Sequence, residues 1–202
     1  MLDRFTLPLF TVPHRLVARA CLRMNLSPNF VTVTGALIGL SAAPLIAMHC
    51  YLWALTLILL NRFLDGVDGT MARTDTVGPT DRGAFLDTVC DFLFYAAVPL
   101  GFALAEPAAN ALPAAVLLAS FIGSASTFLA FAVAAAKRGM ASPAYPNKGF
   151  YYLSGLTEGT ETILLFCAMC LWPQQFAWLA YGFAAACAVT TATRLYFGMR
   201  SL

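Results

Sequence analysis

The sequence predicts an all-α, polytopic membrane protein, with six transmembrane helices preceded by an amphipathic juxtamembrane helix. Three observations predict this class: 60% of the 202 residues are apolar, only 11% are charged, and the mean hydropathy is +0.75. Soluble domains carry about 25% charged residues, and no long polar block suggests a separate soluble domain. We therefore expect one transmembrane domain, residues 27–202, after an N-terminal segment, residues 1–26.

The N-terminal segment alternates basic and apolar residues between Arg4 and Arg23. This pattern is typical of an amphipathic helix that lies on the anionic inner leaflet, and a frayed basic tail is the alternative. Ser27 followed by Pro28 favours a helix start at this point, with Ser27 as the N-cap and Pro28 as the first helical residue.

Six stretches are candidates for membrane spans, because a spanning helix needs about 20 mostly apolar residues. They run over residues 30–48, 51–73, 83–104, 112–137, 148–172 and 175–199. Lys and Arg are absent from the loops near residues 50, 107–111 and 173, and they occur at the opposite ends of the spans. By the positive-inside tendency, both termini face the cytoplasm.

The second and third spans carry acidic residues within "LDGVDGTMARTDTVGPTDRGAFLDTVCDF", residues 64–92. Asp65 and Asp68 are three residues apart, and Asp87 and Asp91 are four apart, so each pair lies on one helix face. At about 1.5 Å per residue, both pairs lie at one depth in the cytoplasmic third of the bilayer. A short loop makes the two helices antiparallel neighbours, so we expect the four carboxylates to converge.

Four converging carboxylates need neutralisation, since each charge inside the bilayer costs about 2.5 to 3.5 kcal/mol. Two divalent cations would neutralise them, and oxygen-only ligands suit Mg²⁺ or Mn²⁺. The alternative is ion pairing with Arg62, Arg73 and Arg82. Three arginines do not neutralise four aspartates, so the sequence favours the metal site.

Small residues stand one helical turn from the acids: Gly69, Ala72 and Gly83. A large polar ligand could lie there against the backbone, and close helix packing is the alternative explanation. Arg73, just beyond, is suited to binding a phosphate with two parallel hydrogen bonds.

This pattern resembles the signature of the CDP-alcohol phosphotransferase (CDP-alcohol phosphatidyltransferase) family: "DGVDGTMAR", nine residues, then "GAFLDTVCD". All eight positions that the family pattern fixes are present: Asp65, Asp68, Gly69, Ala72, Arg73, Gly83, Asp87 and Asp91. The opening "SPNFVTVTG" of the first span is also similar to the family's own. The resemblance implies a bacterial-type homodimer in the inner (plasma) membrane, with its active site facing the cytoplasm.

The resemblance implies transfer of a substituted phosphate from a CDP-alcohol, expected to be CDP-diacylglycerol, to the hydroxyl of a small polar alcohol. CMP is released, and the reaction belongs to phospholipid biosynthesis. Asp65, Asp68 and Asp87 would hold one of two divalent cations, and Asp65, Asp87 and Asp91 the other. Asp91 would also be the catalytic base for the attacking hydroxyl. The implied CDP contacts are Gly69, Ala72, Arg73 and Gly83, with Asn29 and Thr32 from the first span.

The acceptor is not specified by this signature. Glu158 and Glu161 lie in the fifth predicted span, in "GLTEGTE", and an intramembrane acid is a candidate functional residue. "GLTEG" resembles the GPTEG element of the ethanolamine and choline phosphotransferase branch, with Leu156 in place of proline. Glu158 would bind the acceptor, or it is a buried structural acid bonded to Ser or Thr or paired with Arg194.

Arg138 and Lys148 flank the loop before the fifth predicted span. They would suit a phosphorylated acceptor, but the positive-inside tendency explains them equally well.

Two other functions stay open. A CDP-ethanolamine or CDP-choline type of donor could react with diacylglycerol, which would make the lipid the acceptor. An ion- or proton-coupled transporter would also place acids in a membrane, but the outer halves of the spans are apolar and no internal repeat is visible. We expect a lipid bilayer around the chain and no nucleic acid partner.

Overall fold

The computed structural model describes residues 3–74, 78, 80–139 and 155–201, and every regular element in this part is helical. The elements in chain order are α1 (Asp3–Arg23), α2 (Pro28–Leu40), α3 (Ala42–Ala47), α4 (Tyr51–Thr74), α5 (Asp81–Ala105), α6 (Pro107–Lys137), α7 (Gly159–Leu171), a 3₁₀ turn η1 (Pro173–Gln175) and α8 (Phe176–Ser201). The predicted all-α class is therefore confirmed.

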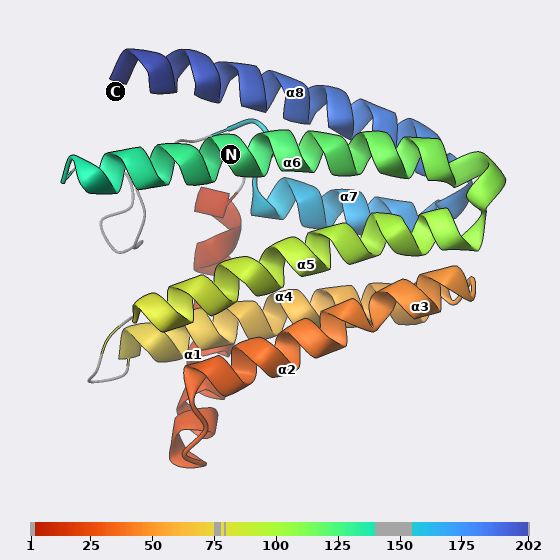
Figure 1. Ribbon diagram of the computed structural model, residues 1–202. Coiled ribbons are helices and arrows are strands. Elements are labelled where there is room, and N and C mark those ends of the chain that lie inside the picture. The colour runs from red at the N-terminus through yellow and green to blue at the C-terminus, as the bar shows by residue number, and fades with distance from the viewer. Residues whose placement is uncertain (1–2, 75–77, 79, 140–154, 202) are drawn as a thin grey trace.

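Helices α2 to α8 run side by side as a bundle, and α1 lies across them beside α4 (Figure 1). Ala18 of α1 is buried against a small apolar cluster that includes Val31, Val67 and Met71. The predicted cap at the start of α2 is present, because the backbone nitrogen of Phe30 donates to Ser27 Oγ over 3.2 Å.

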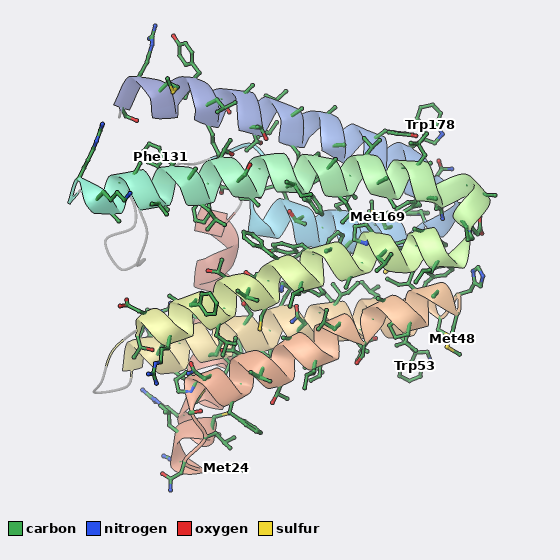
Figure 2. All side chains as sticks on the ribbon, viewed as in Figure 1. Met24, Met48, Trp53, Phe131, Met169 and Trp178 are labelled. Carbon is green, nitrogen blue, oxygen red and sulfur yellow. The ribbon has the colours of Figure 1, made fainter. Side chains whose placement is uncertain are left out.

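The main core is formed by helices α3 to α8 and is rich in aromatic rings: Phe94, Phe102, Phe166 and Phe176 are fully buried. Many large apolar side chains instead point outward, as expected of a bundle whose solvent is lipid. Trp53 and Trp178 are among the most exposed, at 70% and 77%, and both lie at the same end of the bundle (Figure 2). Tryptophan is enriched at membrane interfaces, so this end suits one surface of the bilayer.

Among the residues that the structure describes, four helical segments are long and apolar enough to cross a membrane: Pro28–Ala47, Asp81–Ala105, Pro107–Lys137 and Pro173–Ser201. The chain is thus an integral membrane protein with several spans. Helix α4 is 24 residues long but contains charged residues, and α7 has only 13 residues in the described part. The predicted number of six spans stays a prediction.

Three predicted boundaries differ from the structure. The first span is divided at Ser41 into α2 and α3, because Pro44 lacks the N–H that would continue the hydrogen bonding of α2. Residues 107–111 are not a loop, since α6 begins at Pro107, a residue that favours the first helical position. In the described part of the predicted span over 148–172, the helix begins at Gly159, and residues 140–154 lie outside the described part.

Candidate active site

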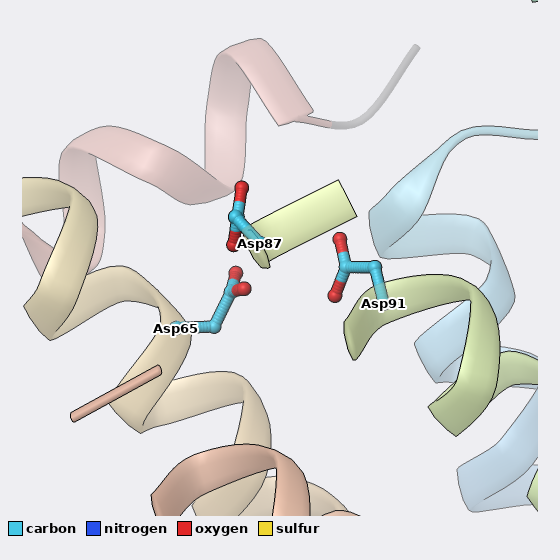
Figure 3. Close-up of side chains that lie close together, drawn as sticks. All are labelled: Asp65, Asp87 and Asp91. Carbon is cyan, nitrogen blue, oxygen red and sulfur yellow. The ribbon is translucent and has the colours of Figure 1, made fainter. Parts of the chain in front are cut away.

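Three carboxylates from α4 and α5 meet in the bundle. One oxygen each of Asp65, Asp87 and Asp91 lies within 4.8 Å of the others, and the three side chains point toward one another (Figure 3). The spacing of four on α5 places Asp87 and Asp91 on one face. Helix α4 runs antiparallel to α5, and α2 packs against both. The predicted convergence therefore holds for these three residues.

The fourth predicted carboxylate, Asp68, lines the same pocket but lies deeper. It is 5% exposed, and its Oδ2 atom is buried with no hydrogen-bond partner in the described part of the chain. Burying a carboxylate oxygen without a hydrogen-bond partner is unfavourable. Coordination of a cation by this oxygen would remove the cost. Together with three clustered oxygen donors, this group fits Mg²⁺ or Mn²⁺.

Arg62 is the arginine that pairs with these acids. Its Nη2 atom donates to Asp91 Oδ1 over 2.7 Å, and its Nη1 atom lies 3.6 Å from Asp65 Oδ2. The predicted alternative of ion pairing is thus realised in part. When ionised, the four aspartates and Arg62 together carry a net negative charge, so the cluster still suits a cation.

The residues predicted to contact CDP lie near the start of α2, near the end of α4 and near the start of α5. The guanidinium of Arg73 lies over Gly69, where an added Cβ would be 3.4 Å from Nη1. At Gly83 an added Cβ would be 3.3 Å from Asn29 Oδ1, so Asn29 faces the start of α5. Thr80 caps that helix by accepting the backbone N–H of Gly83 over 3.1 Å.

Thr32 and Ala72 have less distinctive surroundings. Thr32 lines the carboxylate pocket, but its hydroxyl donates to the carbonyl of Pro28 over 3.1 Å. Thr32 thus bonds the backbone of its own helix, and its predicted contact with CDP stays a prediction. Ala72 is half-buried on α4, one turn beyond Asp68.

Glu158 is the N-cap of α7 rather than a residue within a helix. Its Oε1 atom accepts the backbone N–H of Gly155 over 3.2 Å, and its own N–H donates to Glu161 Oε2 over 3.3 Å, which completes a capping box. These contacts favour the structural interpretation. Arg194, also buried, donates to the carbonyl and hydroxyl oxygens of Ser124 on α6.

The predicted basic pocket for an acceptor is not tested. Arg138 is exposed at the end of α6, and Lys148 lies outside the described residues.

The sequence analysis did not single out two residues that line the carboxylate pocket, Asn61 and Cys90. Asn61 is 3% exposed and donates to the carbonyl of Gly35 on α2 over 2.8 Å. An amide in the apolar run "LILLNRFLD" was the available signal, because polar side chains inside a membrane usually have a partner. Cys90 gave no such signal, since cysteine is common in apolar spans.

The fold and the pocket define a class: an α-helical membrane protein with a carboxylate cluster held between two antiparallel helices. The family model described as CDP-alcohol phosphatidyltransferase matches residues 25–193. The chain belongs to the CDP-alcohol phosphatidyltransferase family, and its activity is that of a phosphatidyltransferase in phospholipid biosynthesis.

Relatives and solved structures agree. Over 202 residues the chain is 50% identical to inner membrane protein YnjF of Escherichia coli (strain K12), covering 100% of this chain and 97% of that one. It is 36% identical over 107 residues to phosphatidylinositol phosphate synthase of Streptomyces avermitilis, covering 52% and 43%.

Among solved structures, the fold is similar to Mycobacterium tuberculosis phosphatidylinositol phosphate synthase with CDP-DAG bound, with a TM-score of 0.74, 22% identity and 92% of each chain covered. The same enzyme in complex with manganese and citrate gives a TM-score of 0.73 at 21% identity, covering 92% and 88%. At this identity the likeness concerns the fold.

Proposed function

We propose that this protein transfers the phosphatidyl group of CDP-diacylglycerol to the hydroxyl of a small polar alcohol and releases CMP. The observation that carries the proposal is the convergence of Asp65, Asp87 and Asp91 beside the buried, unpartnered oxygen of Asp68. A donor of this kind is also named in the description of a structural neighbour, which contains CDP-DAG.

Two divalent cations, Mg²⁺ or Mn²⁺, are proposed to bind at this cluster. Asp65, Asp68 and Asp87 would hold one, and Asp65, Asp87 and Asp91 the other. When bound, they would supply positive charge to the pyrophosphate of the donor and to the departing CMP. The manganese in a structural neighbour supports a metal of this type.

The chain's own residues would then orient the reactants. Arg73, lying over Gly69, would bind a donor phosphate oxygen, and the absence of a side chain at Gly69 and Gly83 would let the donor approach the helix backbone. Asn29 would contact the donor from the start of α2. Asp91, one of the three clustered carboxylates, would accept the proton of the attacking hydroxyl.

The same proposal includes the setting. The carboxylates would face the cytoplasm, where a water-soluble nucleotide leaves, in a bacterial inner membrane. Six spans, residues 27–202, would form the catalytic unit of a homodimer, with residues 1–26 on the membrane surface. Arg138, Lys148 and Glu158 would contact the acceptor, and Glu158 would do so while it caps α7.

The test is to incubate purified protein with Mg²⁺, labelled CDP-diacylglycerol and a panel of alcohols, and to measure CMP and the lipid product. We expect CMP release that depends on one acceptor, on the metal and on Asp91. Release of CMP only from CDP-ethanolamine or CDP-choline with diacylglycerol would reverse donor and acceptor. Full activity in Asp91→Asn would show that Asp91 is not the catalytic base. If no donor gives CMP, the proposed phosphatidyltransferase activity is wrong.

A further inference from the structure

The side chain of Arg62 is largely buried and is fixed by hydrogen bonds. Only 17% of the side chain is exposed, and its Nε atom donates to Asn61 Oδ1 over 2.9 Å. Asn61 is itself fixed to the carbonyl of Gly35. A chain of hydrogen bonds therefore runs from the backbone of α2 through α4 to Asp91 on α5.

Two aromatic rings of α5 hold the same guanidinium. Its central carbon lies 4.9 Å from the ring centroid of Phe94 and 5.7 Å from that of Tyr95. Arginine is favoured in such positions because its planar cation stacks on rings while its N–H groups bind carboxylates. Its position beside the carboxylates is thus set by contacts on several sides.

The guanidinium contacts two of the three clustered carboxylates, Asp91 at 2.7 Å and Asp65 at 3.6 Å. A carboxylate has two oxygens, so one group can serve an arginine and a metal at once. Even so, a fixed positive charge next to the ligands repels a cation. Four ionised aspartates and Arg62 together carry three negative charges, and two divalent cations would leave one positive charge for the donor's pyrophosphate to neutralise.

We infer that Arg62 is the resident counter-cation of this site: it positions Asp91, permits the carboxylates to pack before metal binds, and weakens metal binding relative to a site without it. The inference rests on the proposed function and assigns a role to a residue outside the eight signature positions. Arg62 is a positioning residue, since it acts through Asp91 and Asp65.

The experiment compares Arg62→Gln, Arg62→Lys and wild-type protein in detergent. Thermal unfolding is followed in EDTA and during Mn²⁺ titration, and calorimetry gives the dissociation constant of Mn²⁺. Arg62→Gln should unfold at a lower temperature than wild type in EDTA and bind Mn²⁺ roughly tenfold more tightly, because the repulsion is gone. Arg62→Lys keeps the charge and should bind Mn²⁺ as weakly as wild type.

Arg200→Gln is the matched charge control, because it removes an exposed arginine that stacks on Tyr196. It should change neither the unfolding temperature nor the dissociation constant of Mn²⁺.

Mn²⁺ affinity in Arg62→Gln equal to or weaker than wild type would overturn the inference. If Arg62→Gln folds only when Mn²⁺ is added, the metal has replaced the guanidinium and the inference stands. If it folds in neither condition, Arg62 is needed for packing and the inference fails. A wild-type protein that binds no Mn²⁺ would instead contradict the proposed metal centre itself, so the two failures are distinguishable.

Discussion

The side-chain nitrogen Nδ2 of Asn61 donates to the backbone carbonyl of Gly35 over 2.8 Å, and this buried bond joins α4 to α2 beside the carboxylates. Asn61→Ala should lower the free energy of unfolding by about 1–3 kcal/mol, since a buried hydrogen bond is lost. It should also lower CMP release, because Asn61 Oδ1 holds Arg62. Denaturant unfolding and the CMP assay check both.

Asn110→Ala is the matched control for Asn61. Asn110 is also buried and bonds a backbone carbonyl, that of Phe102, but at the other end of α5. We expect similar destabilisation with activity retained in the folded fraction. Equal loss of activity in both variants would mean that Asn61 acts through stability alone.

Asp87→Asn should reduce CMP release by at least about 100-fold, since it removes a charged ligand from the cluster. Asp81, exposed in the first turn of the same helix, offers the comparison. Asp81→Asn changes the same charge on the same helix and should leave activity within about twofold of wild type. Initial rates at saturating Mg²⁺ test the pair, and comparable losses would argue against the cluster as the catalytic centre.

Gly39→Ala should destabilise the fold. The added Cβ would lie 2.7 Å from Asn61 Cγ and 2.8 Å from Phe94 Cδ2, and overpacking of this kind costs about 1–3 kcal/mol. Gly182→Ala, on α8, meets no atom within 4 Å and should be neutral or stabilising by up to about 1 kcal/mol, because alanine favours helix. The melting temperatures of both variants and of wild type, measured in the same detergent, test this prediction. An unchanged melting temperature for Gly39→Ala would contradict it.

Cys90 should report whether the donor enters the carboxylate pocket, because it lines that pocket with Asp87 and Asp91. We expect CDP-diacylglycerol with Mg²⁺ to slow alkylation of Cys90 several-fold, measured by peptide mass spectrometry. Cys50, in the turn between α3 and α4, serves as the internal control and should react at an unchanged rate. Equal labelling of Cys90 with and without donor would place the donor elsewhere.

His14 links α1 to α4, since its ring packs on Phe63 and occupies the space that a side chain at Gly66 would need. Burial, and then the charge of Arg73, lower the pKa of His14 below its usual 6.5. The folded state therefore binds this proton less readily than the unfolded state, so its stability falls as the pH drops below about 6.5. His14→Gln should flatten that part of the profile of melting temperature against pH. An identical pH profile in the variant would exclude His14 as the cause.

Much of the architecture could be predicted because it depends on local patterns. The apolar composition and the length of the apolar stretches predict an α-helical membrane protein. The pair Ser27–Pro28 predicts the start of α2. The boundary of α7 could not be predicted in this way. Residues 155–158, Gly-Leu-Thr-Glu, contain no proline that would mark a helix boundary. In the structure, Glu158 caps α7, and Thr157 bonds Thr190 of α8 through both its backbone N–H and its hydroxyl. Such a contact joins residues 33 positions apart and leaves no periodic signal.

The sequence by itself determined which aspartates share a helix face, because spacings of three and four place Asp65 with Asp68, and Asp87 with Asp91, on single faces. Only the tertiary structure decided how the two faces turn toward each other. That rotation brings Asp65, Asp87 and Asp91 within 4.8 Å, buries Asp68 beside them, and gives Arg62 a closer partner in Asp91 than in Asp65 on its own helix. The physical reason is that helix orientation follows from packing across the whole bundle, through contacts such as those of Asn61 and Gly39, and not from any one segment.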